Sequence, residues 1–241
     1  MTNDCLHPAI PAIPAMPDMR SALRRALGMV ALLASTLLSQ PLRAWDAAAM
    51  QTAALRLGPQ AAQAVAPLQA LLLSMSAMDD TARLHAVNRF FNQRIRFDTD
   101  LAVWGEEDYW ASPLEALQQG RGDCEDFAIA KYASLLAAGV APAHLRLVYV
   151  RARLDAPGRP ATSQPHMVLA YQPRPGDDPL ILDNLKPDVL TATQRPDLSP
   201  VFSFGTEGLW HGNDTVSAGD PLWRLSRWRA VWAKLHDEGF V

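Results

Sequence analysis

The chain has 241 residues, of which 49% are hydrophobic, and it carries a formal net charge of -3. This length is enough to bury one substantial core, with room for a small appended subdomain. The charge gives no indication of nucleic-acid binding, and we expect no nucleic-acid partner.

Residues 1–44 have the layout of a leader followed by a secretory signal peptide. Three arginines precede the apolar run 26–38, and a small residue, Ala44, stands before Trp45. A positive region, a short apolar core and a small residue are typical of such peptides. The run is too short for a stable membrane anchor, although an uncleaved anchor is the alternative. We therefore expect cleavage after Ala44 and a single exported domain over residues 45–241.

Cleavage at this point changes the cysteine content. Cys5 is removed, and Cys124 becomes the only cysteine of the mature chain. A lone thiol in an oxidising compartment is a liability unless it is buried or used.

The first part of the mature chain is predicted to be helical. Residues 45 to about 78 are rich in alanine and leucine, with helix breaks expected near Gly58-Pro59 and at Pro67. Residues 80–95 have the apolar spacing of an amphipathic helix. Ser112-Pro113 predicts an N-cap and a proline at the first position of a short helix.

A buried central helix is predicted to begin near Cys124. Gly120 and Gly122 precede it and permit backbone angles that a side chain would forbid. Residues 127–138 are almost all apolar, which indicates a buried helix, and Gly139 is placed for a left-handed C-terminal cap.

Cys124 is a candidate nucleophile because it lies in the first turn of this helix. The helix dipole favours the thiolate there, although small apolar cysteines often serve only in packing. Asp123, Glu125 and Asp126 bracket Cys124 and should raise its pKa, which opposes activation. The acids could be simple dipole partners, but a hard divalent cation with oxygen ligands would resolve the conflict. We therefore expect a metal at Asp123 and Glu125, with Asp126 as a further ligand.

After the central helix the apolar period changes to two. Residues 145–150, 166–171 and 180–185 are predicted to be strands, with a turn over 172–178. Residues 186–219 are predicted to be mostly irregular. A C-terminal helix is expected from Asp220-Pro221 onward, with a tryptophan stripe that packs in the core.

The predicted hairpin places a histidine and an aspartate together. A turn symmetric about Arg174-Pro175 sets Tyr171 opposite Asp178 and His166 opposite Asp183. A cysteine nucleophile needs a base, and the base needs an orienting acceptor. Cys124, His166 and Asp183 are therefore the candidate catalytic residues.

These residues belong to a larger set of motifs that matches a known family. The chain resembles the bacterial transglutaminase-like cysteine proteinases of the LapG type, over essentially all of residues 45–241. The matching segments are Arg121-Gly-Asp-Cys-Glu-Asp-Phe-Ala-Ile-Ala-Lys131, His166-Met-Val-Leu169, Leu182-Asp-Asn-Leu185, Trp104-Gly-Glu-Glu-Asp-Tyr-Trp110, Arg195-Pro-Asp-Leu198 and Gly208-Leu-Trp210.

The resemblance implies an α+β, papain/transglutaminase-like fold in which a central buried helix carries the cysteine and packs on a small antiparallel sheet. It implies a periplasmic, calcium-dependent cysteine endopeptidase. Substrates in the family are large repeat adhesins of biofilms, cut near the N-terminus at a paired-alanine site and so released from the outer membrane. In the family, an inner-membrane cyclic-di-GMP receptor sequesters the protease when the nucleotide is abundant, and we expect the same partner here.

The resemblance also implies roles for individual residues. Cys124 is the nucleophile, His166 the base and later the acid, and Asp183 the orienting residue, while calcium binds at Asp123 and Glu125. The backbone N–H of Cys124 is a natural oxyanion donor. The second donor stays open among Gln118, Trp104 and Trp110.

Two other classes of function compete with proteolysis. The same three residues could transfer the acyl group to an amine or hydrolyse a non-peptide amide. A catalytically silent binding module is the non-enzymatic alternative, and an intact Cys/His/Asp set argues against it.

Overall fold

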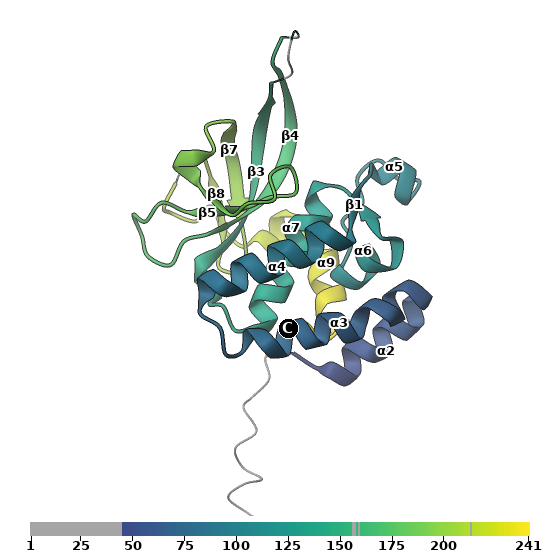
Figure 1. Cartoon of the computed structure of the whole chain (residues 1–241). Coiled ribbons are helices and arrows are strands. Elements are labelled where there is room, and N and C mark those ends of the chain that lie inside the picture. The colour runs from purple at the N-terminus through teal and green to yellow at the C-terminus, as the bar shows by residue number, and fades with distance from the viewer. Residues whose placement is uncertain (1–44, 156–157, 159, 213) are drawn as a thin grey trace, which may run out of the picture. The chain divides into compact units, whose positions relative to one another are not determined.

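The computed structural model of the protein describes residues 45–241 except 156–157, 159 and 213 (Figure 1). The predicted signal peptide over residues 1–44 lies outside the described residues. Among the helices of the described part, none has the length and apolar content that crossing a membrane requires.

Helices form the first part of the domain, as predicted, with one difference at Pro67. Helices α2 (Ala47–Leu57) and α3 (Pro59–Met75) are separated at Gly58, where φ is 145°. Pro67 lies inside α3, so the predicted break there was wrong. Its ring is exposed, while the apolar residues on the other side of α3 are fully buried. The burial of this face outweighs the hydrogen bond that proline cannot donate.

The next helices lead toward the central one. Helix α4 spans Asp80–Arg94 and is followed by α5 (Asp100–Val103) and α6 (Pro113–Gln119). The predicted N-cap of α6 is confirmed, because the Ser112 hydroxyl accepts from the Glu115 N–H and the Glu115 carboxylate accepts from the Ser112 N–H. This capping box defines where α6 starts and holds the segment before it.

A six-stranded antiparallel sheet forms the other layer, in the order β6-β5-β4-β3-β7-β8 (Figure 1). Its strands are β3 (Leu145–Leu154), β4 (Thr162–Tyr171), β5 (Leu180–Leu182), β6 (Leu190–Thr191), β7 (Leu198–Phe204) and β8 (Leu209–His211). A parallel pair, β1 (Arg96–Phe97) with β2 (Arg121–Gly122), lies apart from it.

Helix α7 (Cys124–Ala137) is at the centre of the domain and packs against α4, α6, β3 and β4 (Figure 1). It is buried over most of its circumference, and even its polar residues Lys131 and Ser134 are fully buried. Gly139 follows with φ 87°, as expected of a left-handed cap. The structure confirms the predicted α+β fold, with a buried central helix on a small antiparallel sheet.

The C-terminal third is more regular than predicted. Residues 186–219 contain β6, a 3-10 turn over Ala192–Gln194, β7 and β8, so the prediction of mostly irregular structure holds for the segment as a whole but missed these short strands. Strand β7 contains Pro200, and its pairing with β3 includes a register shift. The sequence of β7 therefore lacks the regular alternation of apolar and polar residues that indicates a strand.

The predicted C-terminal helix is two helices, α8 (Pro221–Arg224) and α9 (Ser226–Asp237). The core role of the tryptophan stripe is confirmed at Trp228, which is fully buried and packs edge-on against Tyr132 at 5.5 Å between ring centroids.

A buried carboxyl at the end of α9 makes the domain's stability depend on pH. The Ser112 hydroxyl donates to the Glu238 carboxylate. Burial is the main cause that raises the Glu238 pKa to about 7, and the charge of Glu115 adds to it. The folded state therefore keeps this proton to a higher pH than the unfolded chain, and stability falls as pH rises from about 4.5 to 7.

We expect Glu238→Gln to stabilise the protein at pH 8 by about 2–3 kcal/mol more than at pH 4.5, because the amide carries no charge to bury. Thermal unfolding at both pH values measures this difference, with the exposed Glu106→Gln as the matched control. A Glu238→Gln variant whose melting temperature shifts equally at both pH values would contradict the assignment.

Candidate active site

Cys124 is the first residue of α7, and a second capping box holds it there. The Asp123 side chain accepts from the Glu125 N–H at 3.2 Å, and the Asp126 side chain accepts from the Asp123 N–H at 3.3 Å. Gly120 has φ 59° and caps α6, as expected.

Gly122 does not have a positive φ, so the predicted backbone reason was wrong for this glycine. A Cβ at position 122 would lie 2.5 Å from Oδ2 of Asp126. Gly122 is needed for space, because the chain passes directly over the carboxylate that closes the capping box.

Cys124 is buried, at 9% exposure. Its sulfur donates to Oε2 of Glu125 at 2.8 Å and accepts from the backbone N–H of Met167 on β4. Burial raises the pKa of the thiol, and Glu125 and then Asp123 raise it further. This agrees with the expectation that the neighbouring carboxylates oppose thiolate formation.

His166 and Asp183 form a buried pair, at 2% and 1% exposure. Nε2 of His166 lies 2.8 Å from Oδ1 of Asp183. Burial alone would raise the Asp183 pKa, but His166, the Leu185 N–H and Arg195 together lower it to about 2. An ionised carboxylate only accepts hydrogen bonds, so the His166 Nε2 that faces it is a donor, which leaves Nδ1 as the ring nitrogen that can take a proton.

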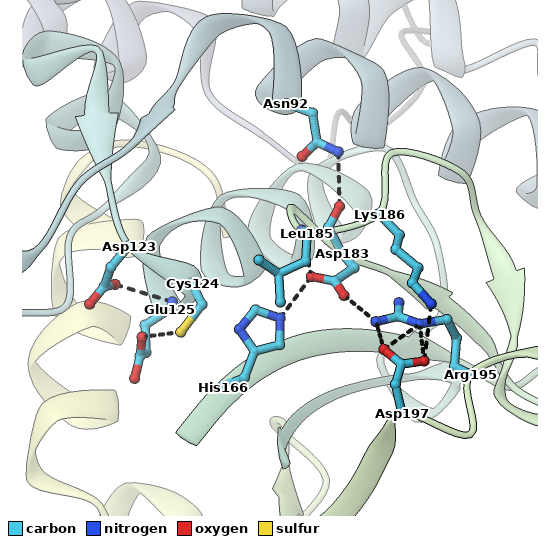
Figure 2. A network of polar contacts seen from close by, with 10 residues as sticks. All are labelled: Asn92, Asp123, Cys124, Glu125, His166, Asp183, Leu185, Lys186, Arg195 and Asp197. Atoms are coloured by element: carbon cyan, nitrogen blue, oxygen red, sulfur yellow. Dashed lines mark hydrogen bonds and ion pairs between the residues drawn. The ribbon is translucent and has the colours of Figure 1, made fainter. Parts of the chain in front are cut away.

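The structure brings these three candidate residues to one place. Figure 2 shows the His166 ring between Cys124 and Asp183, with one ring nitrogen toward Asp183 and the other turned to the side of Cys124. Strand β5 pairs with Leu169–Tyr171 of β4 and ends there, so Met167 and His166 lie beyond the paired stretch. The start of α7 meets β4 at this point, through the Met167 N–H.

The predicted hairpin register was wrong by two residues. Tyr171 pairs with Leu180 and not with Asp178. Continued to His166, this register sets Leu185 opposite the histidine, so Asp183 is its diagonal neighbour. A shift of two residues keeps every side chain on its side of the sheet, and the pair can therefore still meet.

An acidic cluster lies beside the thiol and would fit a cation. Ligand atoms of Asp123, Cys124 and Glu125 lie within 4.8 Å of one another, as do those of Asp100, Asp123 and Asp126. Burial, followed by the charges of Glu125, Asp126 and Asp100, raises the Asp123 pKa to about 9. Crowded carboxylate oxygens of this kind are the donors that a hard divalent cation prefers.

The contribution of the individual acids to this cluster differs. Both oxygens of Asp126 already accept from backbone, from the Ala111 N–H at 2.8 Å and the Asp123 N–H at 3.3 Å. Burial raises the Asp126 pKa to about 7.

Asp100 is a member of the cluster that the sequence did not indicate, and it lies at the start of α5 with 4% exposure. No sequence pattern indicates this role for Asp100, because only the pairing of β1 with β2 brings it near Asp123.

The candidates for the second oxyanion donor are reduced to two. The Gln118 side chain accepts from the Ala61 N–H and donates to Gln60, both at 2.9 Å, so its amide is engaged at the start of α3. The indole N–H groups of Trp104 and Trp110 are buried without a hydrogen-bond partner in the described part of the chain. Both indoles therefore stay candidates for the second donor.

The chain is similar to known proteins over most of its length. Residues 64–197 match the family model of the bacterial transglutaminase-like cysteine proteinases. The structure is similar to LapG of Legionella pneumophila in an EGTA-treated form, with a TM-score of 0.68 and 36% sequence identity over 79% of this chain and 97% of that chain. A calcium-bound form of the same protein gives a TM-score of 0.64 at 36% identity, over 79% of this chain and 99% of that chain. A comparison with curated proteins found no match.

The family model covers more than half of the chain, and the similarity to LapG extends over nearly the whole of that protein. The chain belongs to the bacterial transglutaminase-like cysteine proteinases.

Proposed function

We propose that the protein is a periplasmic, calcium-dependent cysteine endopeptidase that cuts the N-terminal region of a large repeat adhesin and so releases it from the outer membrane. The observation that carries the proposal is the buried His166–Asp183 pair, 2.8 Å apart, beside a cysteine at the start of the central helix. Family membership and the similarity to LapG support the reaction class.

In the proposed reaction Cys124 attacks the scissile carbonyl carbon while Nδ1 of His166 takes the thiol proton. The C–N bond then breaks, the leaving amine takes that proton from His166, and a thioester to Cys124 remains. Water attacks the thioester, His166 accepts its proton, and the thiol is restored as the carboxylic acid leaves. Asp183 keeps the proton on Nε2 throughout and so holds the ring in the reactive tautomer.

The carbonyl oxygen becomes negatively charged during both attacks. The backbone N–H of Cys124 at the helix start is one donor for it, and the indole of Trp104 or Trp110 is the second.

Asp123 and Glu125, with Asp100 and Asp126, would hold calcium in this proposal. When bound, the ion supplies positive charge that offsets the carboxylates raising the Cys124 pKa. The calcium-bound form of the similar LapG supports the choice of metal.

The cellular part of the proposal concerns export and partners. We propose that residues 1–44 are removed on export and that a membrane receptor responding to cyclic-di-GMP sequesters the protease. N-terminal sequencing of the periplasmic protein tests the first point, and a mature form that retains residues 26–38 would contradict it. Co-purification of the receptor with and without cyclic-di-GMP tests the second.

The function is tested with the purified protein and the N-terminal region of a large repeat adhesin encoded in the same genome. We expect a single cut at a paired-alanine site in calcium buffer, identified by mass spectrometry of both products. The same incubation with an added primary amine separates hydrolysis from acyl transfer. A product that carries the amine in place of the new carboxyl group would favour the transferase alternative, and an uncut substrate with intact Cys124 would favour the binding module.

A further inference from the structure

The Asp183 carboxylate divides its hydrogen bonds between two sides. Oδ1 accepts from Nε2 of His166 at 2.8 Å and from the Leu185 N–H at 3.0 Å. Oδ2 accepts from Nη2 of Arg195 at 2.7 Å. The guanidinium of Arg195 therefore fixes the orientation of the Asp183 carboxylate from the side opposite His166 (Figure 2).

Arg195 is 2% exposed and is held by a second carboxylate. Its Nε and Nη2 lie 3.0 and 2.9 Å from the two oxygens of Asp197, in the forked arrangement typical of arginine–carboxylate pairs. Lys186 lies 3.2 Å from Oδ1 of Asp197. His166, Asp183, Arg195, Asp197 and Lys186 thus form a chain that runs from the active site to the surface, with Lys186 46% exposed at its outer end.

The backbone around Arg195 is also fixed. The Arg195 N–H donates to the Ala192 carbonyl at 3.0 Å, and its own carbonyl accepts from the Leu198 N–H at 3.1 Å, where β7 begins. The Arg153 N–H of β3 donates to the Asp197 carbonyl at 2.8 Å. The fork is therefore anchored to the sheet and can transmit its position to Asp183.

A second cation near Asp183 cannot replace Arg195. Lys131 on α7 is fully buried, and its amine has no hydrogen-bond partner in the described part of the protein. Burial lowers the Lys131 pKa to about 7, against the opposing charge of Asp183. Above that pH the amine is largely neutral, whereas a guanidinium stays charged.

We propose that Arg195 is a positioning residue for the reaction: through its fork on Asp197 it holds the Asp183 carboxylate in the orientation that keeps Oδ1 on Nε2 of His166. The inference rests on the triad proposed above and deepens it. The competing account is that Arg195 only ties the segment between β6 and β7 to the sheet. A buried ion pair adds little net stability as a rule, so stability alone does not explain this arrangement.

Two readouts on the full chain in calcium buffer at one pH test the inference. The first is the downfield N–H resonance of His166 in protein carrying ¹⁵N-labelled histidine, assigned by its loss in His166→Ala. The second is the rate of alkylation of Cys124 by iodoacetamide, followed by mass spectrometry of its peptide so that Cys5 does not interfere.

We expect Arg195→Gln to lose the resonance to solvent exchange and to slow alkylation by about 10- to 100-fold, because a misplacement of about 1 Å can cost a factor of about 10². Arg195→Lys keeps a donor toward Asp183 but cannot form the fork on Asp197, so it should recover the resonance and the rate only in part. Arg174→Gln, an exposed arginine paired with Asp177 at the hairpin turn, should match the wild type.

Several outcomes would overturn the inference. An unchanged resonance and rate in folded Arg195→Gln would show a purely structural role, and full recovery in Arg195→Lys would show that the fork is not what holds Asp183. If Arg195→Gln does not fold, Asp197→Asn decides, because freeing one side of the fork should weaken the resonance and slow alkylation, and a wild-type result would contradict the proposal. If His166→Ala leaves the alkylation rate unchanged, the proposed triad itself fails, whatever Arg195 does.

Discussion

Cys124→Ala, His166→Ala and Asp183→Ala are each expected to abolish cleavage of the adhesin segment. The three side chains act as one unit, so a single loss approaches the loss of all three, a fall in kcat of about 10⁴-fold or more. Product formation by the purified variants, measured in calcium buffer, checks this expectation.

The three substitutions should differ in what they leave intact. Cys124→Ala removes the nucleophile, so its residual rate should equal that of the buffer alone. His166→Ala and Asp183→Ala keep the thiol but lose the base or its orientation, so alkylation by iodoacetamide should slow in both. Asp183→Asn should be milder than Asp183→Ala, because an amide oxygen can still accept from Nε2 of His166.

Matched controls come from the exposed end of α9. His236→Ala and Asp237→Ala remove the same residue types outside the site, and both should keep full activity. Equal thermal stability of Cys124→Ala and the wild type would exclude unfolding as the cause. A Cys124→Ala protein that still cuts the substrate would remove the basis of the mechanism.

The fold could be predicted where the sequence pattern is local. The apolar run of 127–138 and the spacing of 80–95 gave the two helices within a few residues, because amphipathic or buried helices carry their own periodicity. Strand β7 was missed because its partner, β3, is about 50 residues away and its sequence contains Pro200. Long-range pairing across an irregular register leaves no local pattern to read.

The candidate site shows the same division. Cys124 at the start of a buried helix follows from neighbouring residues, and the structure places it there. The His166–Asp183 contact was predicted through an incorrect register and was still found, because the error was an even number of residues.

Neither the place of Asp100 in the acidic cluster nor the contact of Arg195 with Asp183 could be predicted from the sequence. Both lie on segments that tertiary structure alone brings to the site, through the β1–β2 pairing and through the return of the chain into β7. The sequence around Asp100 has no distinguishing pattern, and the motif Arg195-Pro-Asp-Leu198 indicated the family but no role for Arg195, so only the low exposure in the structure singles out the two residues.

Removal of calcium is expected to abolish activity reversibly. Titration of the purified protein with EGTA should reduce cleavage to background, and added calcium should restore it while magnesium should not. Magnesium demands a tight octahedral shell and dehydrates reluctantly, whereas calcium accepts an irregular set of carboxylates such as this one. Full activity in excess EGTA would contradict the metal requirement.

The double variant Asp123→Ala/Glu125→Ala should lose both activity and the stabilisation that calcium gives. A ligand present at 100 times its dissociation constant stabilises the folded state by about 2.7 kcal/mol, which corresponds to several degrees of melting temperature in a domain of this size. The wild type should show this shift on addition of calcium, and the double variant should not.

The matched control is Glu106→Ala/Glu107→Ala, which removes two exposed acids from the segment before α6 and should keep the shift. Activity and the calcium shift together separate two possible causes. Removing Asp123 and Glu125 also removes the negative charge that raises the Cys124 pKa. A double variant that stays active without calcium and shows no calcium shift would therefore mean that the thiol requires relief from this charge, and not the ion itself.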